Sequence, residues 1–288
     1  SDAQIAKTGS WKSAPLEAII IGLKELPDEP KPLHHRHIMF GHAYKGQPEG
    51  QKLLARFKAG GGTLYDLEYL TDDKGIRVAA FGYWAGYAGA AVAIKSWAAA
   101  QQGNICEPLH TFTSAQSLIN HVIKGLNKPR PRVIIIGAKG RVGSGARDFC
   151  SAIDASVTSW DMDETAHGGP FPEILEHDIF LNCILATEKT PIFIPNAVRT
   201  TKRKLMVIGD IACDPRSSYS PIKVYDQVTS WQKPVKRVWD KQILDVTAID
   251  NLPSLLPRES SEDFATQLLP NLMSLNEIET GVWEKAHA

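Results

Sequence analysis

Continuous runs of apolar residues, each about the length of a strand and bounded by glycine, proline or charged residues, recur along most of this chain. Such runs are typical of strands buried on both faces of a sheet, whereas strands with one wet face alternate apolar and polar residues. The pattern predicts strands at 18–23, 37–40, 63–68, 132–136, 157–160, 179–185, 204–211 and 244–249.

The segments between these runs predict helices. We expect a helix over 51–58, before the glycine break at 60–62, and a longer, alanine-rich helix over 85–102, whose small residues allow close packing. The run 252–257 opens a C-terminal helical region, which we expect to fold back on the first domain. Strands that alternate with helical or loop crossovers favour parallel sheets covered on both faces, and therefore an α/β fold.

Residues 132–161 carry the most specific pattern. The run 132–136 is followed at once by Gly137, Gly140 and Gly143, and the next strand ends in Asp161. Glycines placed so permit a tight turn and bring the backbone close to a pyrophosphate, which rests on the N-terminus of the following helix. Asp161 is placed to accept hydrogen bonds from ribose hydroxyls, and its charge repels a 2′-phosphate. The pattern therefore predicts a site that prefers NAD to NADP.

The glycine spacing alone also fits a glycine-rich turn in an unrelated α/β domain, because Gly137 and Gly140 are one position further apart than the usual motif requires. The flanking strand and Asp161 favour the dinucleotide site.

A chain of 288 residues is long enough for two cores. We predict two Rossmann-like domains with parallel sheets separated by a cleft: an NAD-binding domain over 126–250, entered by a linker at 125–131, and a substrate or catalytic domain formed by 1–125 and 251–288.

Composition narrows the function classes. The formal charge is zero, with 32 basic and 32 acidic residues, so nothing indicates a nucleic-acid partner. No apolar run is long enough to span a membrane, and the first residues do not resemble a signal peptide. The four cysteines form no C-x-x-C pair, which fits reduced, buried thiols in an intracellular protein. We therefore expect a cytoplasmic location.

Titratable residues follow the three N-terminal strands. These strands end in Lys24-Glu25, His42 and Glu68. If the strands lie side by side, a lysine, an imidazole and two carboxylates share one edge, where ligands bind in open parallel sheets. A lysine and a histidine suit acid–base chemistry near neutral pH, and neighbouring carboxylates tune both. The alternatives are a solvated Lys24 and Glu25, a core histidine at 42, and a surface ion pair of Glu68 with Arg77.

Three further features remain open from the residues alone. Arg77 could hold a substrate carboxylate with its planar fork, or form a structural ion pair. Asp250, at another strand end, could reach the nicotinamide end of the cleft or cap the following helix. The cluster 34–37 of three histidines and one arginine invites a metal assignment. We expect instead a solvated loop that enters a strand, since no nearby acid or cysteine completes a ligand set.

Ordered blocks of the chain resemble the NAD-dependent, lysine-forming saccharopine dehydrogenases, whose fold is similar to that of alanine dehydrogenase. The resemblance runs from about residue 9 to about residue 275. It is carried by Gly9-Ser10-Trp11-Lys12-Ser13-Ala14-Pro15, Gly22-Leu23-Lys24-Glu25, Phe40-Gly41-His42-Ala43-Tyr44-Lys45, 62–68, 77–82, 137–146, Gly168-Gly169-Pro170-Phe171 and 248–259.

The resemblance implies a reversible reaction, the last step of the aminoadipate route of lysine biosynthesis. Saccharopine, NAD and water give lysine, 2-oxoglutarate and NADH, by way of an imine that water hydrolyses. Lys24 and His42 are then the acid–base pair. The other implied positions are Glu25 and Glu68 for tuning, Lys45, Arg77 and Phe81 facing the substrate, and Gly137, Gly140, Arg141, Val142, Gly143, Asp161, Asp250 and Leu252 at the cofactor.

The implied partners are these small molecules, with no nucleic acid or membrane, and the expected assembly is a monomer or small homo-oligomer. The alternative functions are those of a non-catalytic NAD-binding homologue and of a related amino-acid or opine dehydrogenase.

The chain departs from the family pattern in two places. Family members begin with a further stretch that includes a first strand and a substrate-binding arginine, so we expect the N-terminal part of the first domain to be missing. The segment between Val235 and Leu244 is also hard to align.

Overall fold

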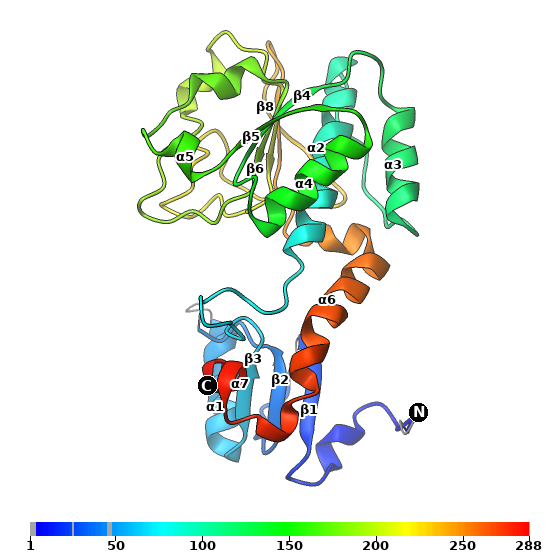
Figure 1. Ribbon diagram of the computed structural model, residues 1–288, viewed down its shortest axis with the longest axis vertical. Helices are drawn as coiled ribbons and strands as arrows, with labels where there is room; N and C mark the ends of the chain where they lie inside the picture. The colour runs from blue at the N-terminus through cyan, green and yellow to red at the C-terminus, as the bar shows by residue number, and fades with distance from the viewer. Residues whose placement is uncertain (1–3, 25, 45–47, 288) are drawn as a thin grey trace. The chain divides into compact units, whose positions relative to one another are not determined.

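The computed structural model describes residues 4–24, 26–44 and 48–287, which form two compact units (Figure 1). Unit 1 is Ser1–Ala80 with Phe264–Ala288, and unit 2 is Phe81–Asp263. This division differs from the predicted boundaries, which assigned 81–125 and 251–263 to the substrate domain. Both segments belong to unit 2 because the helix α2 (Gly82–Gln101) and the 3-10 helix η4 (Leu252–Leu255) bury apolar residues in its cores.

Unit 1 is built on a parallel sheet in the order β1-β2-β3. Its strands are β1 (Ile19–Lys24), β2 (Arg36–Phe40) and β3 (Thr63–Asp66), and the helix α1 (Pro48–Gly60) connects β2 to β3. The expectation of a buried strand is wrong for β1: Ile21 and Leu23 are 53% and 58% exposed. This strand pairs with β2 alone, so it forms an edge of the described sheet.

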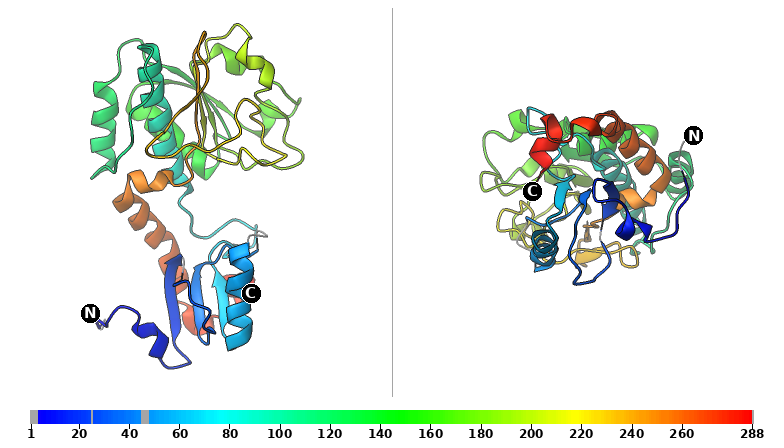
Figure 2. Two further views of the ribbon diagram at one scale, coloured as in Figure 1. Left: turned by 180° about the vertical axis from the view of Figure 1, so that it is seen from behind. Right: turned by 90° about the horizontal axis from the view of Figure 1, so that it is seen from below.

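Helices cover both faces of this sheet (Figures 1 and 2). On one face, Phe57 of α1 packs with Met39 and Leu64 in a small core. On the other face, Trp283 of the helix α7 (Gly281–Ala286) lies 6.3 Å from the Tyr65 ring, and Phe264 of α6 (Pro257–Leu272) lies 5.7 Å from the Phe40 ring. The C-terminal segment thus folds back on the first sheet, as expected.

The histidine cluster is not the solvated loop that the sequence suggested. His37 lies within β2 and is 1% exposed, and His35 just before it is 5% exposed. The His37 ring is enclosed by Trp11 and Phe57, at centroid distances of 5.3 and 5.4 Å. Burial lowers the pKa of His37 to about 4, because the charged ring would lose its hydration. His35 and His37 are therefore part of the core of unit 1, whereas His34 is exposed.

The stability of the protein should fall as His37 becomes protonated in the unfolded chain. The folded-state pKa lies below the ordinary histidine value of 6.5, so this contribution to stability is complete above pH 6.5 and is lost as the pH falls toward 4. At pH 5 we expect a loss of about 2 kcal/mol relative to pH 7.5. Urea unfolding of wild type and His37→Leu at both pH values measures it. The variant should lose about 2 kcal/mol less than wild type, and an equal loss in both would contradict the assignment.

Unit 2 contains a six-stranded sheet in the order β5-β4-β6-β7-β9-β8. The first five strands in this order are parallel, as predicted, and the edge strand β8 is antiparallel to β9. The strands are β4 (Arg132–Ile136), β5 (Ser156–Trp160), β6 (Ile179–Asn182), β7 (Val207–Asp210), β8 (Lys236–Trp239) and β9 (Leu244–Thr247). The segment that was hard to align thus forms β8 and its turn into β9.

The two faces of this sheet are covered differently (Figure 1). The helices α2, α3 (Ala115–Lys124) and α4 (Arg141–Ala152) pack on one face, in a core that includes Val133, Ile135, Phe149 and Leu181. Loops and short helices cover the other face, where a second apolar core includes Phe171, Phe180 and Phe193. Besides η4 and α7, the short helices among the described residues are η1 (Ser10–Ser13), α5 (Met162–Thr165), η2 (Pro172–Glu176), η3 (Asn196–Arg199) and η5 (Leu275–Glu277).

The helices α2 and α4 cross at backbone contact. A Cβ atom added at Gly86 of α2 would lie 1.8 Å from the carbonyl oxygen of Val142, and one added at Gly145 of α4 would lie 1.9 Å from that of Tyr83. Only glycine fits at such a crossing. The predicted close packing of the small-residue helix is therefore correct, and its partner is the helix that follows the glycine turn.

Two remaining expectations concern the membrane and the thiols. Within the described part of the chain, no helix has both the length and the apolar character needed to cross a membrane. All four cysteines are free thiols; Cys106 and Cys150 are buried, as predicted, whereas Cys183 and Cys213 are only partly buried.

Candidate active site

The three strands of unit 1 are parallel, so their carboxyl ends lie side by side along one edge of the sheet, which is the edge meant below. Lys24, the last residue of β1, is in register with Phe40, the last residue of β2. His42 lies two positions beyond β2, and Glu68 lies two positions beyond β3. Because the strands are parallel and adjacent, their carboxyl ends bring these three side chains to a common edge.

His42 and Glu68 form a pair at this edge. The imidazole Nδ1 of His42 lies 3.4 Å from Oε1 of Glu68. The Glu68 side chain is 11% exposed and the His42 side chain 33% exposed, so the carboxylate is mostly enclosed while the ring keeps access to solvent. A carboxylate oxygen at this distance can accept a hydrogen bond from the ring nitrogen. Glu68 is therefore not simply a surface residue.

The backbone that presents His42 is unusual. His42 has a φ of 49°, in the left-handed region that non-glycine residues seldom occupy. Gly41 before it has no room for a side chain, since an added Cβ would lie 2.8 Å from Cδ2 of Leu64. The His42 ring is stacked with that of Phe40, at 6.3 Å between centroids. Backbone strain of this kind often occurs at functional sites.

Asp66, which closes β3, was not predicted as a site residue. It is 0% exposed, and its Oδ1 accepts hydrogen bonds from the backbone N–H of Gly41 at 3.2 Å and of Glu68 at 3.0 Å. Burial is the main cause that raises its pKa, and Glu68 adds to the effect. The signal for it in the sequence is a carboxylate that ends the strand 63–66.

The other residues predicted around the substrate lie in several parts of the chain. Arg77 is exposed and bridges back to Thr71 at the end of a turn. Phe81 belongs to unit 2, where it is the N-cap of α2. Glu25 and Lys45 lie outside the described residues.

The glycine turn of unit 2 lies where the strand order reverses. The chain passes from β4 to β5 on one side and then to β6 on the other, which creates a crevice at the carboxyl ends of β4 and β6. Gly137 occupies this place with a φ of 86°, and an added Cβ would lie 2.6 Å from Cγ2 of Ile184. An added Cβ on Gly143 would lie 2.1 Å from the carbonyl oxygen of Gly137. Both glycines are therefore required by the turn itself.

The turn ends at the N-terminus of α4. Gly140 is its N-cap and offers no side-chain oxygen, and the first bond of the helical ladder runs from Ser144 N to Gly140 O at 2.9 Å. The N–H groups of Val142 and Gly143 thus precede the ladder and have no acceptor within the helix. Together with the helix dipole they make this end of α4 suited to an anionic group such as a pyrophosphate. The geometry fits a dinucleotide.

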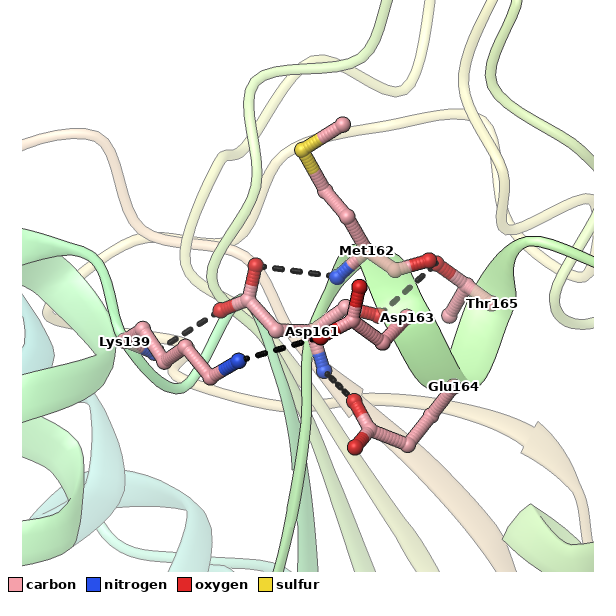
Figure 3. Close-up of polar contacts among 6 residues, drawn as sticks. All are labelled: Lys139, Asp161, Met162, Asp163, Glu164 and Thr165. Carbon is pink, nitrogen blue, oxygen red and sulfur yellow. Dashed lines mark hydrogen bonds and ion pairs between the residues drawn. The ribbon is translucent and has the colours of Figure 1, made fainter.

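Asp161 follows β5 and lies next to the glycine turn (Figure 3). Its Oδ2 accepts from the backbone N–H of Lys139 at 2.8 Å, and its Oδ1 accepts from that of Met162 at 3.0 Å. It is the N-cap of α5, with Glu164 completing a capping box. Each carboxylate oxygen has a further lone pair, so the group can still accept ribose hydroxyls. The turn and the predicted ribose acceptor are thus joined by a hydrogen bond.

Two predicted cofactor residues and one unpredicted network lie at the carboxyl ends of the later strands. Asp250 is exposed just after β9, and Leu252 is 4% exposed in a core.

The unpredicted network is centred on Asp210, which is 2% exposed at the end of β7. Its carboxylate accepts from Asn182 Nδ2 at 2.9 Å and from the Tyr225 hydroxyl at 2.5 Å. Polar residues that end apolar strands, here β6 and β7, were the available signal.

Comparison with known proteins identifies the family of the chain. Residues 1–88 match the family model described as alanine dehydrogenase/PNT, N-terminal domain. The structure of an L-alanine dehydrogenase, 17% identical, covers 99% of this chain and 80% of that chain with a TM-score of 0.67, and so shares the fold. The L-lysine-forming, NAD(+) saccharopine dehydrogenase of Schizosaccharomyces pombe is 44% identical over 96% of this chain and 80% of that protein. Its counterpart in Yarrowia lipolytica is also 44% identical, over 99% and 82%. The chain therefore belongs to the family of the NAD(+), L-lysine-forming saccharopine dehydrogenases.

Proposed function

We propose that this chain catalyses the NAD-dependent oxidative deamination of L-saccharopine to L-lysine and 2-oxoglutarate, reversibly, as the last step of the aminoadipate route of lysine biosynthesis. The observation that carries the proposal is the His42–Glu68 pair at 3.4 Å, at the same sheet edge as Lys24, in a chain 44% identical to enzymes of this name. The glycine turn of unit 2 supports a dinucleotide cofactor.

NAD is the cofactor that the residues of unit 2 fit. Gly137, Gly140, Arg141, Val142 and Gly143 would hold the pyrophosphate at the N-terminus of α4. The ribose would bind Asp161, and Asp250 and Leu252 would line the nicotinamide end. When bound, NAD accepts the hydride that leaves the glutaryl α-carbon of the substrate.

The remaining chemistry is proton transfer, which the side chains at the edge of unit 1 can supply. The secondary amine of saccharopine must be neutral before it is oxidised, water must lose a proton when it adds to the resulting imine, and the departing lysine amine must gain one. Lys24 and His42 are a base and an acid at neighbouring strand ends, so two groups share these transfers. Glu68 and Glu25 would tune them, while Arg77, Lys45 and Phe81 would face the substrate, whose carboxylates suit the two cations.

The assembly and location follow from the same proposal. We infer a monomer or small homo-oligomer that acts on small molecules in the cytoplasm. The balance of 32 basic and 32 acidic residues supports partners that are neither nucleic acid nor a charged surface.

The test is turnover of L-saccharopine by the full-length protein, followed as NADH formation at 340 nm, with L-alanine and an opine as competing substrates. Lysine and 2-oxoglutarate should appear in equal amounts with the NADH. Turnover of another amino acid alone would redirect the proposal to a related dehydrogenase. NADH binding without turnover of any of them would contradict an enzymatic function.

Cofactor preference should depend on Asp161. Asp161→Asn removes the charge that repels a 2′-phosphate while retaining one oxygen for capping α5. We expect the ratio of NADPH to NADH dissociation constants to fall by at least about tenfold, which is about 1.4 kcal/mol, since an unfavourable like-charge contact is removed. Fluorescence titration with both cofactors measures this ratio. The matched control is Asp163→Asn, which removes a nearby exposed carboxylate; if both variants lower the ratio equally, Asp161 is not the discriminating residue.

A further inference from the structure

The carboxylate of Asp66 joins the ends of two strands in unit 1. A single oxygen, Oδ1, accepts the backbone N–H of Gly41, beyond β2, and of Glu68, beyond β3. The side chain is completely buried, and Oδ2 has no hydrogen-bond partner among the described residues. A buried carboxylate oxygen without a hydrogen-bond partner costs free energy, so a stabilising role alone does not account for it.

The bond to Gly41 restricts the backbone that carries His42. A Cβ atom added at Gly41 would lie 2.8 Å from Cδ2 of Leu64 and 3.1 Å from Oδ2 of Asp66, and His42 takes its left-handed φ of 49° directly after it. A residue in that region remains there only when its surroundings hold it. The acceptor on Asp66 is the polar contact that fixes Gly41 at this point.

The bond to Glu68 fixes the other half of the pair. The backbone N–H of Glu68, two residues after Asp66, donates to Oδ1 of Asp66. Two further bonds hold the same turn: Leu67 N donates to Met39 O at 3.0 Å, and Tyr69 N donates to the carbonyl oxygen of Asp66 at 2.9 Å. The turn after β3 therefore has its backbone directions set by β2 and by Asp66. One oxygen atom thus sets the start of both segments whose side chains meet at 3.4 Å.

We propose that Asp66 is a positioning residue, which holds His42 and Glu68 in the geometry that proton transfer requires by serving as a shared acceptor for Gly41 and Glu68. The catalytic consequence rests on the proposed function of His42. The geometric part does not, because it concerns the His42–Glu68 pair itself.

The proposal separates two properties of Asp66, its acceptor and its charge. Asp66→Asn keeps an acceptor oxygen at the same place and removes the charge. Asp66→Glu keeps the charge but moves the oxygens outward by one methylene, so they cannot serve both N–H groups in the same way. A positioning role predicts that asparagine replaces aspartate and glutamate does not. A purely electrostatic role predicts the reverse.

The experiment crosses these two variants with Glu68→Gln in the full-length protein. We expect Asp66→Asn to keep kcat/KM for saccharopine close to wild type, and Asp66→Glu to lower it about tenfold to hundredfold, as small misplacements of reacting groups do. The dissociation constant of NADH should not change in either. Glu68→Gln should lower kcat/KM by the same factor in wild type and in Asp66→Asn, and by much less in Asp66→Glu. An equal factor in all three backgrounds would overturn the proposal.

A second readout does not require turnover. The side-chain NMR signal of His42, assigned by its loss in His42→Gln, should shift on Glu68→Gln in wild type and in Asp66→Asn but not in Asp66→Glu. This pattern would support the positioning role even if saccharopine proved not to be the substrate, and a shift of equal size in all backgrounds would exclude it. Circular dichroism checks folding, and Asp66→Ala replaces the glutamate variant if that one unfolds. If both unfold, Asp66→Asn decides, since loss of the response there overturns the proposal and its retention supports it.

Discussion

Replacing Lys24 by methionine and His42 by glutamine together should lower kcat for saccharopine oxidation by about 10²–10⁴-fold, the usual contribution of acid–base catalysis. The substitutions remove both groups proposed to carry protons at the edge of unit 1, while the glycine turn and Asp161 belong to unit 2. The dissociation constant of NADH should therefore stay close to that of wild type. Steady-state kinetics and fluorescence titration measure the two quantities on the same preparations.

The matched control exchanges the same residue types at the other end of unit 1. Lys31→Met with His34→Gln alters an exposed lysine and an exposed histidine that precede β2. This variant should turn over like wild type. Normal kcat in the Lys24/His42 variant, or an equal loss in the control, would show that the protons are carried by other groups.

Gly143→Ala should damage both the fold of unit 2 and its cofactor site. The added methyl group would lie 2.1 Å from the carbonyl oxygen of Gly137, and a backbone atom cannot yield as a flexible side chain can. The turn and the start of α4 must separate, at a cost of about 2 kcal/mol or more in unfolding free energy. Because the same turn is proposed to hold the pyrophosphate, NADH affinity should fall by at least about tenfold. Urea unfolding and NADH titration measure the two effects.

Gly140→Ala is the control that separates the two effects. Its added methyl group would meet only the Gly137 carbonyl oxygen, at an ordinary 3.5 Å, and Gly140 has a φ of −73°. Stability should change little. A loss of NADH affinity without a loss of stability would support contact between the cofactor and this turn, whereas wild-type stability in Gly143→Ala would contradict the steric argument.

The central strands of unit 2 were predictable because their apolar runs match their environment. Strands β4, β6 and β7 are buried on both faces, and β4 and its glycine turn lie where the pattern placed them. The same rule failed for the edge strands β1 and β5, which are exposed or only partly buried, since an apolar run cannot reveal how many neighbours a strand has. The edge strand β8 was missed because a short polar run such as 236–239 does not resemble a buried strand; its Arg237 pairs with the buried Asp245 at 2.9 Å.

The helix α3 could have been found, because Ser114 and Ser117 form a capping box at its start.

The candidate site was predictable in part. Strand ends and parallel order brought Lys24, His42 and Glu68 to one edge, as the pattern predicted. The roles of Asp66 and Asp210 could not be read from the sequence, because hydrogen bonds to a backbone N–H depend on the path of loops that carry no periodic signal. In both cases an acid at the end of an apolar strand proved to organise the loops around it.

The contact between α2 and α4 limits how this protein can vary. Because Gly86 and Gly145 bring the two helix backbones together, a larger residue at either position would push the phosphate-facing end of α4 away from its turn. A substitution at Gly86, which belongs to a helix outside the glycine turn, would then weaken cofactor binding. A library of random variants should accordingly show intolerance at these two glycines equal to that at the glycine turn.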